Sequence, residues 1–283
     1  MSAILQFCAV VVAAIATIYV TGQGGMLSRK CLELFHGKAG CLPIPELHNV
    51  TLHYFTLRGR AEAIRLIMED TGIAYEQNLF TGATWPDAKK AGIESGIFPF
   101  GQVPAIVTDS GFSLVQSHAI VHYLGRTKGL DCDCLDVQQC EVLAAGAEDF
   151  GSKLSKLVYA SEFTADMWDD YMKNVAPIWL SHFEKLAPQI RSEETSFFTG
   201  GRITWVDYLI FNMLDGQVEF GKLDVGLPTV DVLEPYPKLS SFYNRFRTRE
   251  KIAAYLNSDR RLPYSGPKVT PKKEETKDKP KEN

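Results

Sequence analysis

The chain has few of the features that mark specialised classes of protein. It contains only six cysteines in 283 residues, too few for a disulfide-rich scaffold, and it has no internal repeat. Lysine and arginine total 30 against 34 for aspartate and glutamate, so the net charge of −4 gives no indication of nucleic-acid binding. The content of 45% hydrophobic and 23% charged residues excludes a wholly disordered or fibrous chain. Length and composition together predict a globular protein with two domains.

Charge is absent from the apolar run at residues 3–20. As a helix this run would be about 27 Å long, close to the ~30 Å hydrocarbon core of a bilayer. We therefore predict a transmembrane anchor within residues 1–22. A cleaved signal peptide is the alternative, although no basic residue precedes the run and no clean cleavage site follows it. A buried core helix would need a large core around it.

The flanking charges predict an orientation for this segment. Arg29 and Lys30 follow it, so the positive-inside rule places the rest of the chain in the cytoplasm, anchored to a membrane. If the leader is cleaved, the protein is secreted. Residues 23–48 are predicted to be a linker. Residues 267–283 hold six lysines, four acids and no aromatic residue, which predicts a disordered charged tail.

The middle of the chain, residues 49–266, has the pattern of an α/β domain followed by helices. A helix with apolar residues at helical spacing is predicted from Ala61 to Thr71 and ends at Gly72. A second helix follows Ser117, which we expect to cap it, and helices continue after Arg126. Thr204 to Asp207 resembles a capping box. The predicted strands Val50–Phe55 and Tyr75–Phe80 flank the first helix and so should form a parallel pair. The predicted strands Pro104–Thr108 and Phe112–Val115 flank Asp109-Ser110-Gly111 and should form a hairpin.

Six motifs stand in a fixed order in this middle region. They are LHYFTLRGRAE at 52–62, Trp85-Pro86 with Lys89, PFGQVP at 99–104, QSHAIVHYL at 116–124, EDF at 148–150 and ITWVDY at 203–208. In this order they resemble the cytosolic-type glutathione S-transferases, within the sigma/pi branch. The resemblance implies a thioredoxin-like N-terminal domain (βαβ-ββα) at 49–127, an inter-domain linker at 128–136 and an all-helical domain at 137–266. It also implies a transferase that uses glutathione as co-substrate and no metal, and that forms a homodimer.

The chemistry of such an enzyme depends on a thiolate. A free thiol has a pKa of about 8.5, and lowering it by about two units requires roughly 2.7 kcal/mol. One hydroxyl donor to an anion contributes about 1.5–3 kcal/mol. Tyr54, just before the predicted turn into the first helix, is well placed to be that donor. The resemblance implies that Arg60 supports the thiolate.

Glutathione has two carboxylates, one amine and a free backbone edge, and the resemblance assigns residues to each. A cis Pro104 would leave Val103 free to pair with the cysteinyl backbone. Ser117 at a helix N-terminus and Gln116 would hold the γ-glutamyl carboxylate. Asp149 would reach the glutathione of the partner subunit. The implied glutathione-binding residues are Tyr54, Trp85, Lys89, Gln102, Val103, Pro104, Gln116, Ser117 and Asp149, with Trp85 and Lys89 holding the glycyl carboxylate.

The second substrate is expected to be a hydrophobic electrophile. The resemblance places Phe55, Leu57 and Tyr159 in its pocket, where Tyr159 could donate a hydrogen bond. Two other functions stay open. One is a glutathione-dependent prostaglandin-type isomerase of the same branch, and the other is a non-catalytic ligand-binding or structural relative.

Two features depart from an ordinary member of this family. Residues 92–97 are predicted to be an insertion, which weakens the assignment of Lys89. Cys132, Cys134 and Cys140 lie close together, but no ligand pair or nearby histidine completes a metal site, so we predict reduced thiols. Cys31 and Cys41 could form a bridge only if the linker were lumenal.

Overall fold

The computed structural model describes residues 47–133, 135–187 and 197–269. The predicted anchor, nearly all of the linker to residue 48, with Cys31 and Cys41, and the tail from residue 270 lie outside the described residues. Within the described ranges, no helix combines the length and the apolar composition needed to cross a membrane.

A four-stranded mixed sheet organises the N-terminal domain, in the order β2-β1-β3-β4. Strands β1 (Val50–Phe55) and β2 (Tyr75–Phe80) are parallel, with Tyr54 opposite Leu79. Strand β3 (Ala105–Val107) runs antiparallel to β1 and pairs with β4 (Ser113–Val115) in the predicted hairpin. The parallel pair and the hairpin are confirmed.

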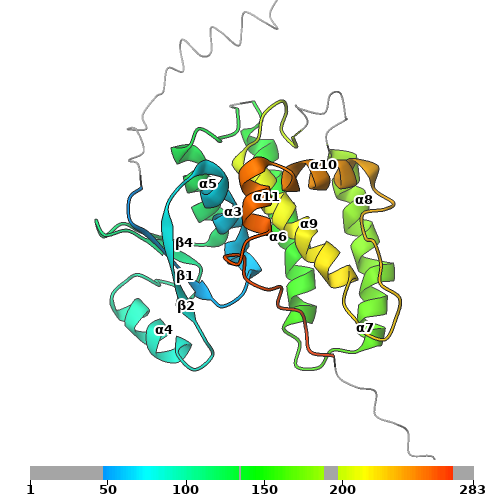
Figure 1. Ribbon diagram of the computed structural model, residues 1–283, viewed down its shortest axis with the longest axis horizontal. Helices are drawn as coiled ribbons and strands as arrows, with labels where there is room; N and C mark the ends of the chain where they lie inside the picture. Colours follow the sequence, from blue (N-terminus) through cyan, green and yellow to red (C-terminus); the bar gives the residue numbers. More distant parts are fainter. Residues whose placement is uncertain (1–46, 134, 188–196, 270–283) are drawn as a thin grey trace, which may run out of the picture. The chain divides into compact units, whose positions relative to one another are not determined.

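Helices accompany this sheet on different sides. After a 3-10 turn at Gly59–Ala61, α3 (Glu62–Thr71) ends at Gly72, whose φ of 73° confirms the predicted C-terminal glycine. Helices α3 and α5 (Ser117–Thr127) lie between the sheet and the helical domain, whereas α4 lies away from that domain (Figure 1).

Two helix starts differ from the sequence pattern. The pattern predicts no helix between the second and third strands, but residues there form α4 (Trp85–Glu94), with Pro86 in the first turn, where a missing N–H costs nothing. The hydroxyl of Thr84 also accepts the backbone N–H of Thr81, which closes the preceding turn. Ser117 is not the N-cap of α5. Gln116 occupies that position, and Ser117 is the first helical residue.

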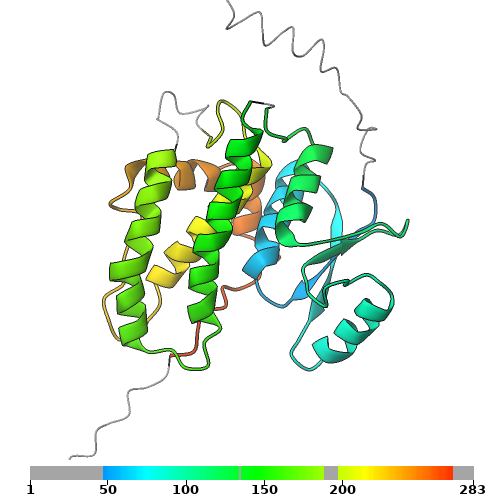
Figure 2. The ribbon, with the colours of Figure 1, turned by 180° about the vertical axis from the view of Figure 1, so that it is seen from behind.

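The C-terminal domain is helical, as predicted. Its long helices α6 and α9 contact each other, and α9 also contacts α3 and α5 (Figure 2). Disulfide-bonded Cys132 and Cys140 tie the preceding segment to the first turn of α6, so the prediction of reduced thiols at these two positions was wrong. The elements are α6 (Val137–Val158), α7 (Ala165–Asp170), a π-helical turn (Tyr171–Val175), α8 (Ala176–Leu186), α9 (Trp205–Gly221), α10 (Pro237–Arg247) and α11 (Glu250–Leu256).

The predicted capping box at the start of α9 is confirmed, and it is buried. The Asp207 carboxylate accepts the backbone N–H of Thr204 at 2.8 Å and that of Phe198 at 3.0 Å. Burial raises the pKa of Asp207 to about 6, and the two backbone N–H donors oppose this shift. The charged form of Asp207, at the start of α9, is therefore stabilised by these two backbone N–H donors.

Candidate active site

Two cavities lie next to the C-terminal end of β1. The larger has a volume of about 390 Å³ and the smaller about 350 Å³. Arg60 and Ser117 line both of them. The two spaces therefore meet at the 3-10 turn before α3 and at the first residue of α5.

Tyr54 lines the larger cavity beside this junction. Its side chain is 5% exposed, and its hydroxyl oxygen accepts the backbone N–H of Arg60 at 2.9 Å. Because that oxygen accepts from the backbone, its own hydrogen is free to be donated elsewhere. Burial raises the pKa of Tyr54, while the Arg60 N–H and the guanidinium groups of Arg60 and Arg65 oppose the shift. The phenol therefore stays protonated and remains a donor at neutral pH.

The turn that follows Tyr54 is shaped by a glycine and a buried arginine. Gly59 has φ of 44°, and a Cβ at this position would come within 2.6 Å of the Tyr54 hydroxyl. Any other residue would therefore displace the hydroxyl or the turn. Arg65 is fully buried and donates to the carbonyls of Leu57 and Arg58, each at 3.2 Å. Helix α3 thus stabilises the turn through Arg65.

The smaller cavity has an aromatic floor. The Trp85 ring packs edge-on against Phe55, with ring centroids 5.3 Å apart, and also lies against Phe80 and Phe98. Phe98 in turn occupies the space beside Gly92, where an added Cβ would clash with its ring. The beginning of the expected 92–97 insertion therefore packs against this floor. Phe55, which the resemblance placed in the electrophile pocket, instead lines the smaller cavity.

Backbone of unusual conformation forms the opposite wall of the smaller cavity. The Val103–Pro104 peptide is cis, as predicted, and both residues line the cavity with Gln102. Gln116 has φ of 72° and ψ of 115°, a conformation that a residue with a side chain rarely adopts. Strained residues of this kind cluster at ligand sites. Ser117 follows it and presents the N-terminus of α5 to the cavity.

Two residues of the implied glutathione set lie outside both cavity walls. Lys89 is exposed on α4, and its side chain runs close to Gly101, which belongs to the wall of the smaller cavity. Asp149 is exposed on α6. The structure therefore brings Tyr54 and the other implied glutathione residues to the two cavities, and leaves these two at or beyond their edges.

The larger cavity is lined from both domains. Leu57 and Tyr159 belong to its wall, as the resemblance implied, and Tyr159 is 62% exposed. Glu148 of α6 faces Arg60 across the cavity, with 3.7 Å between carboxylate and guanidinium. Helix α9 adds Asn212 and Met213. These polar and apolar groups suit a ligand of mixed character.

Sequence reasoning missed the contribution of the segment after α11. Tyr264 and Ser265 line the larger cavity, and the Tyr264 hydroxyl is buried without a hydrogen-bond partner among the described residues. Arg58 holds this segment by donating to the carbonyl of Leu262 at 2.7 Å. Arg261 pairs with Glu62 at 3.1 Å. No local motif marks these residues, because their role depends on contacts more than 190 positions apart.

Comparison with known families covers both domains. Residues 50–126 match the family model described as glutathione S-transferase, N-terminal domain. Residues 148–259 match the model described as glutathione S-transferase, C-terminal domain. The matched ranges include the sheet, most of the helices and the residues of the N-terminal domain that line the two cavities.

Individual relatives agree with these matches. The chain is 30% identical to glutathione S-transferase P 1 of Bufo bufo over 221 residues, which cover 76% of this chain and 96% of the relative. It is 32% identical to human glutathione S-transferase P over 219 residues, with the same coverage. Among solved structures, the Onchocerca volvulus Pi-class glutathione S-transferase is 26% identical with a TM-score of 0.62, covering 74% of this chain and 92% of that one.

Proposed function

This chain belongs to the glutathione S-transferase family, and from that premise we propose that Tyr54 is the residue that stabilises the glutathione thiolate. The family is one of enzymes with glutathione as co-substrate. The observation that carries the proposal is the hydrogen bond from the Arg60 N–H to the Tyr54 oxygen at the junction of the two cavities. That bond orients the phenol and leaves its hydrogen for the sulfur.

The smaller cavity suits the tripeptide. Its wall offers backbone next to the cis Pro104, the indole of Trp85 and the N-terminus of α5 at Ser117. A carboxylate is favoured at a helix N-terminus by the unpaired N–H groups and the dipole. With the γ-glutamyl end at Ser117, the cysteinyl sulfur falls towards Arg60 and Tyr54. Lys89 serves the glycyl carboxylate from the rim.

The larger cavity is the place we propose for the electrophile. Thiolate sulfur at the junction would attack an electrophilic carbon held between Leu57, Tyr159 and α9, forming the carbon–sulfur bond as the leaving group departs. Tyr54 then only has to stabilise the anion before attack. The reaction demands no redox step from the protein itself.

The position of Asp149 is consistent with the homodimer that we propose. This carboxylate is exposed on α6 and lies outside both cavity walls of its own chain. We propose that it reaches the glutathione amine in the partner subunit. The exposed apolar side chains of Phe100 and Val142, at 67% and 60%, would be covered in such an assembly.

The anchor at residues 3–20 also remains a proposal. Two features of the chain predict opposite orientations for this anchor. Arg29 and Lys30 favour a cytoplasmic enzyme, whereas the Cys132–Cys140 bond favours an oxidising compartment, and with it the alternative of an exported chain. Carbonate extraction followed by protease protection of the C-terminus in intact membranes separates these outcomes. A protected C-terminus supports export.

The transferase function is tested with the full-length protein on immobilised glutathione and with a generic aryl halide. Retention on the glutathione matrix and conjugation of the halide are expected. Failure of both would support the non-catalytic alternative. The prostaglandin-type isomerase is the second candidate. The prostaglandin synthase D of Nilaparvata lugens is 22% identical over 76% of this chain, a likeness in fold alone, so the products formed from an endoperoxide decide it.

A further inference from the structure

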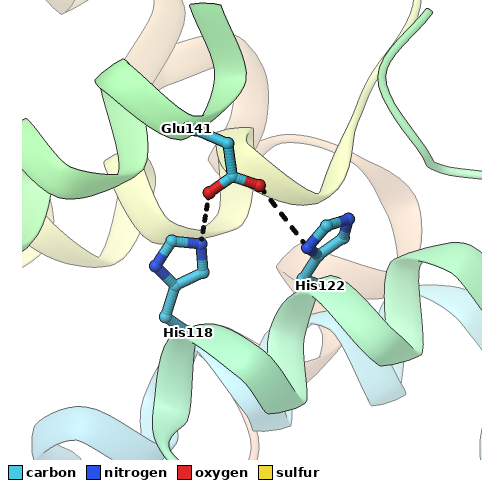
Figure 3. A group of neighbouring side chains, drawn as sticks. All are labelled: His118, His122 and Glu141. Carbon is cyan, nitrogen blue, oxygen red and sulfur yellow. Dashed lines mark ion pairs between the residues drawn. The ribbon is translucent and has the colours of Figure 1, made fainter. Parts of the chain in front are cut away.

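Three metal-ligating side chains meet on the surface between the two domains, outside the roles assigned above. His118 and His122 stand four residues apart on α5, and Glu141 faces them from α6 (Figure 3). A spacing of four places two side chains on the same face of a helix. One ligand atom from each residue lies within 4.8 Å of the other two.

Two distances in this cluster are close to those between the ligands of one metal ion. Glu141 Oε2 lies 3.3 Å from His118 Nε2, and Glu141 Oε1 lies 3.6 Å from His122 Nδ1. Bonds of about 2.0–2.2 Å around a tetrahedral zinc ion put neighbouring ligand atoms about 3.3–3.5 Å apart. The carboxylate is therefore already at ligand spacing from each imidazole. Small rotations of side chains that are 28–47% exposed bring all three to one ion.

Neighbouring side chains orient the two imidazoles, as residues around the ligands of a metal site do. His122 Nε2 lies 3.3 Å from Asp131 Oδ1, so Nδ1 can bind metal while Nε2–H donates to a carboxylate. The charge of Asp131 is balanced by Arg126 at 3.3 Å. Both imidazole rings also lie on the indole of Trp205, with ring centroids 5.1 and 4.4 Å away. Few rotamers remain open to them.

We propose that His118, His122 and Glu141 bind one divalent zinc-type ion, with water in the fourth position. Two imidazoles and one carboxylate form a borderline donor set that suits zinc and disfavours magnesium, which prefers oxygen ligands. The proposal does not depend on the transferase reaction. It does place a metal next to Ser117, since His118 is the following residue and also lines the larger cavity.

Such an ion would join the two domains. Helix α5 belongs to the N-terminal domain and α6 to the C-terminal domain, and the Cys132–Cys140 bond fixes the first turn of α6 one residue before Glu141. A ligand that binds only the folded arrangement raises the melting temperature in proportion to the logarithm of its concentration. Zinc is therefore expected to stabilise the whole molecule.

The test uses the untagged full-length chain, freed of metal with a chelator and then titrated with Zn²⁺ by calorimetry and with Co²⁺ by absorption. One ion per chain is expected, with the visible bands of a four-coordinate nitrogen and oxygen site. His118→Asn and Glu141→Gln should each weaken binding at least ten-fold and abolish the zinc-dependent rise in melting temperature. Magnesium should have no effect.

A matched control is available on α8. His182 is exposed and lies outside the cluster, so His182→Asn should bind zinc like the wild type. Asp131→Asn removes the carboxylate beside His122, and with it the ion pair to Arg126, and should weaken binding about ten-fold or more without touching a ligand. The melting temperature of each variant is also measured without metal, so that a loss of folding is distinguished from a loss of metal binding.

Three results would overturn the proposal. The first is a wild-type chain that binds neither zinc nor cobalt. The second is equal binding by the wild type and by folded His118→Asn and Glu141→Gln variants. The third is a sulfur-to-cobalt charge-transfer band, which would place the ion on free cysteines instead.

Discussion

The two cavities differ in how the chain builds them. The smaller one is lined only by residues of the N-terminal domain, namely Phe55, Arg60, Trp85, residues 100–104 and residues 115–117. The larger one takes its wall from the turn after β1, from α6, from α9 and from the segment after α11. One site is thus made by local backbone geometry and the other by the packing of distant elements.

Under the proposed assignment of glutathione to the smaller cavity and the electrophile to the larger one, this difference separates two tasks of the enzyme. A constant co-substrate can be held by backbone groups, a cis peptide and a helix N-terminus, which depend little on neighbouring side chains. A variable substrate needs a wall whose side chains can change while the fold persists. The following predictions test whether the two cavities can be changed independently.

The largest expected effect concerns α9, which contributes only to the larger cavity. The pKa of Asp207 is raised from 3.8 to about 6 in the folded state, so the folded chain binds its proton more tightly than the unfolded chain does. This contribution to stability is full below about pH 4 and is lost as pH rises through about 6, an order of about 3 kcal/mol.

Asp207→Asn provides the comparison, because asparagine does not titrate in this range. The melting temperature of the wild type relative to the variant should be highest near pH 4 and should fall towards pH 7. A difference that is constant with pH, or that grows as pH rises, would contradict the buried carboxylate. Glutathione retention at pH 4 and 7 shows whether the smaller cavity is disturbed as well.

Tyr54→Phe removes the donor at the junction of the two cavities. Loss of a hydrogen bond to an anion costs about 1.5–3 kcal/mol, so kcat/KM with an aryl halide should fall about 10- to 100-fold. The pKa of bound glutathione, followed by thiolate absorbance, should rise, while the KM for glutathione should change little. An unchanged thiol pKa would exclude Tyr54 as the activator.

Ser117→Ala is directed at the smaller cavity. The backbone N–H groups of α5 remain, so only the hydroxyl contribution of about 1–1.5 kcal/mol is lost. The KM for glutathione should rise about 5- to 10-fold, with an unchanged KM for the electrophile. Equal changes in both KM values would mean that the two cavities are not separate in function.

Tyr264→Phe is directed at the larger cavity and should have the smallest effect. Its buried hydroxyl has no partner among the described residues, so its removal leaves no other group unpaired. We expect KM changes of about two- to five-fold that depend on whether the electrophile carries a hydrogen-bond acceptor. The KM for glutathione is the control and should stay constant. If the KM for glutathione changes more than the KM for the electrophile, Tyr264 acts on the smaller cavity and the prediction is wrong.

The contrast between local geometry and the packing of distant elements also explains which features could be predicted from the sequence. The strand pairing, the Gly72 helix end and the capping box at Asp207 each depend on a few neighbouring residues, and all were predicted. The cis Pro104 was implied by the family resemblance. Helix α4 was missed because its composition, with Pro86, Gly92 and few apolar residues, is typical of a loop. Its packing on Phe80 and Phe98, through Trp85 and Gly92, could not be read from its composition.

The features of the site that the sequence did not indicate have a tertiary cause. The Phe55 ring lies 5.6 Å from that of Tyr54, measured between centroids, but it also packs edge-on against Trp85 and lines the smaller cavity. Tyr264 could not be recognised, because it reaches the cavity through the bonds of Arg58 to Leu262 and Arg261 to Glu62. The disulfide likewise depends on a fold that brings Cys132 to within 6.6 Å of Cys140, measured between Cα atoms.

The position of Tyr264 has a practical consequence for anyone who handles this enzyme. Tyr264 and Ser265 are part of the larger cavity wall. A fluorescent protein or an affinity peptide joined shortly after these residues therefore lies next to that cavity. Substrate preferences measured on such a fusion should be checked against enzyme from which the added part has been removed.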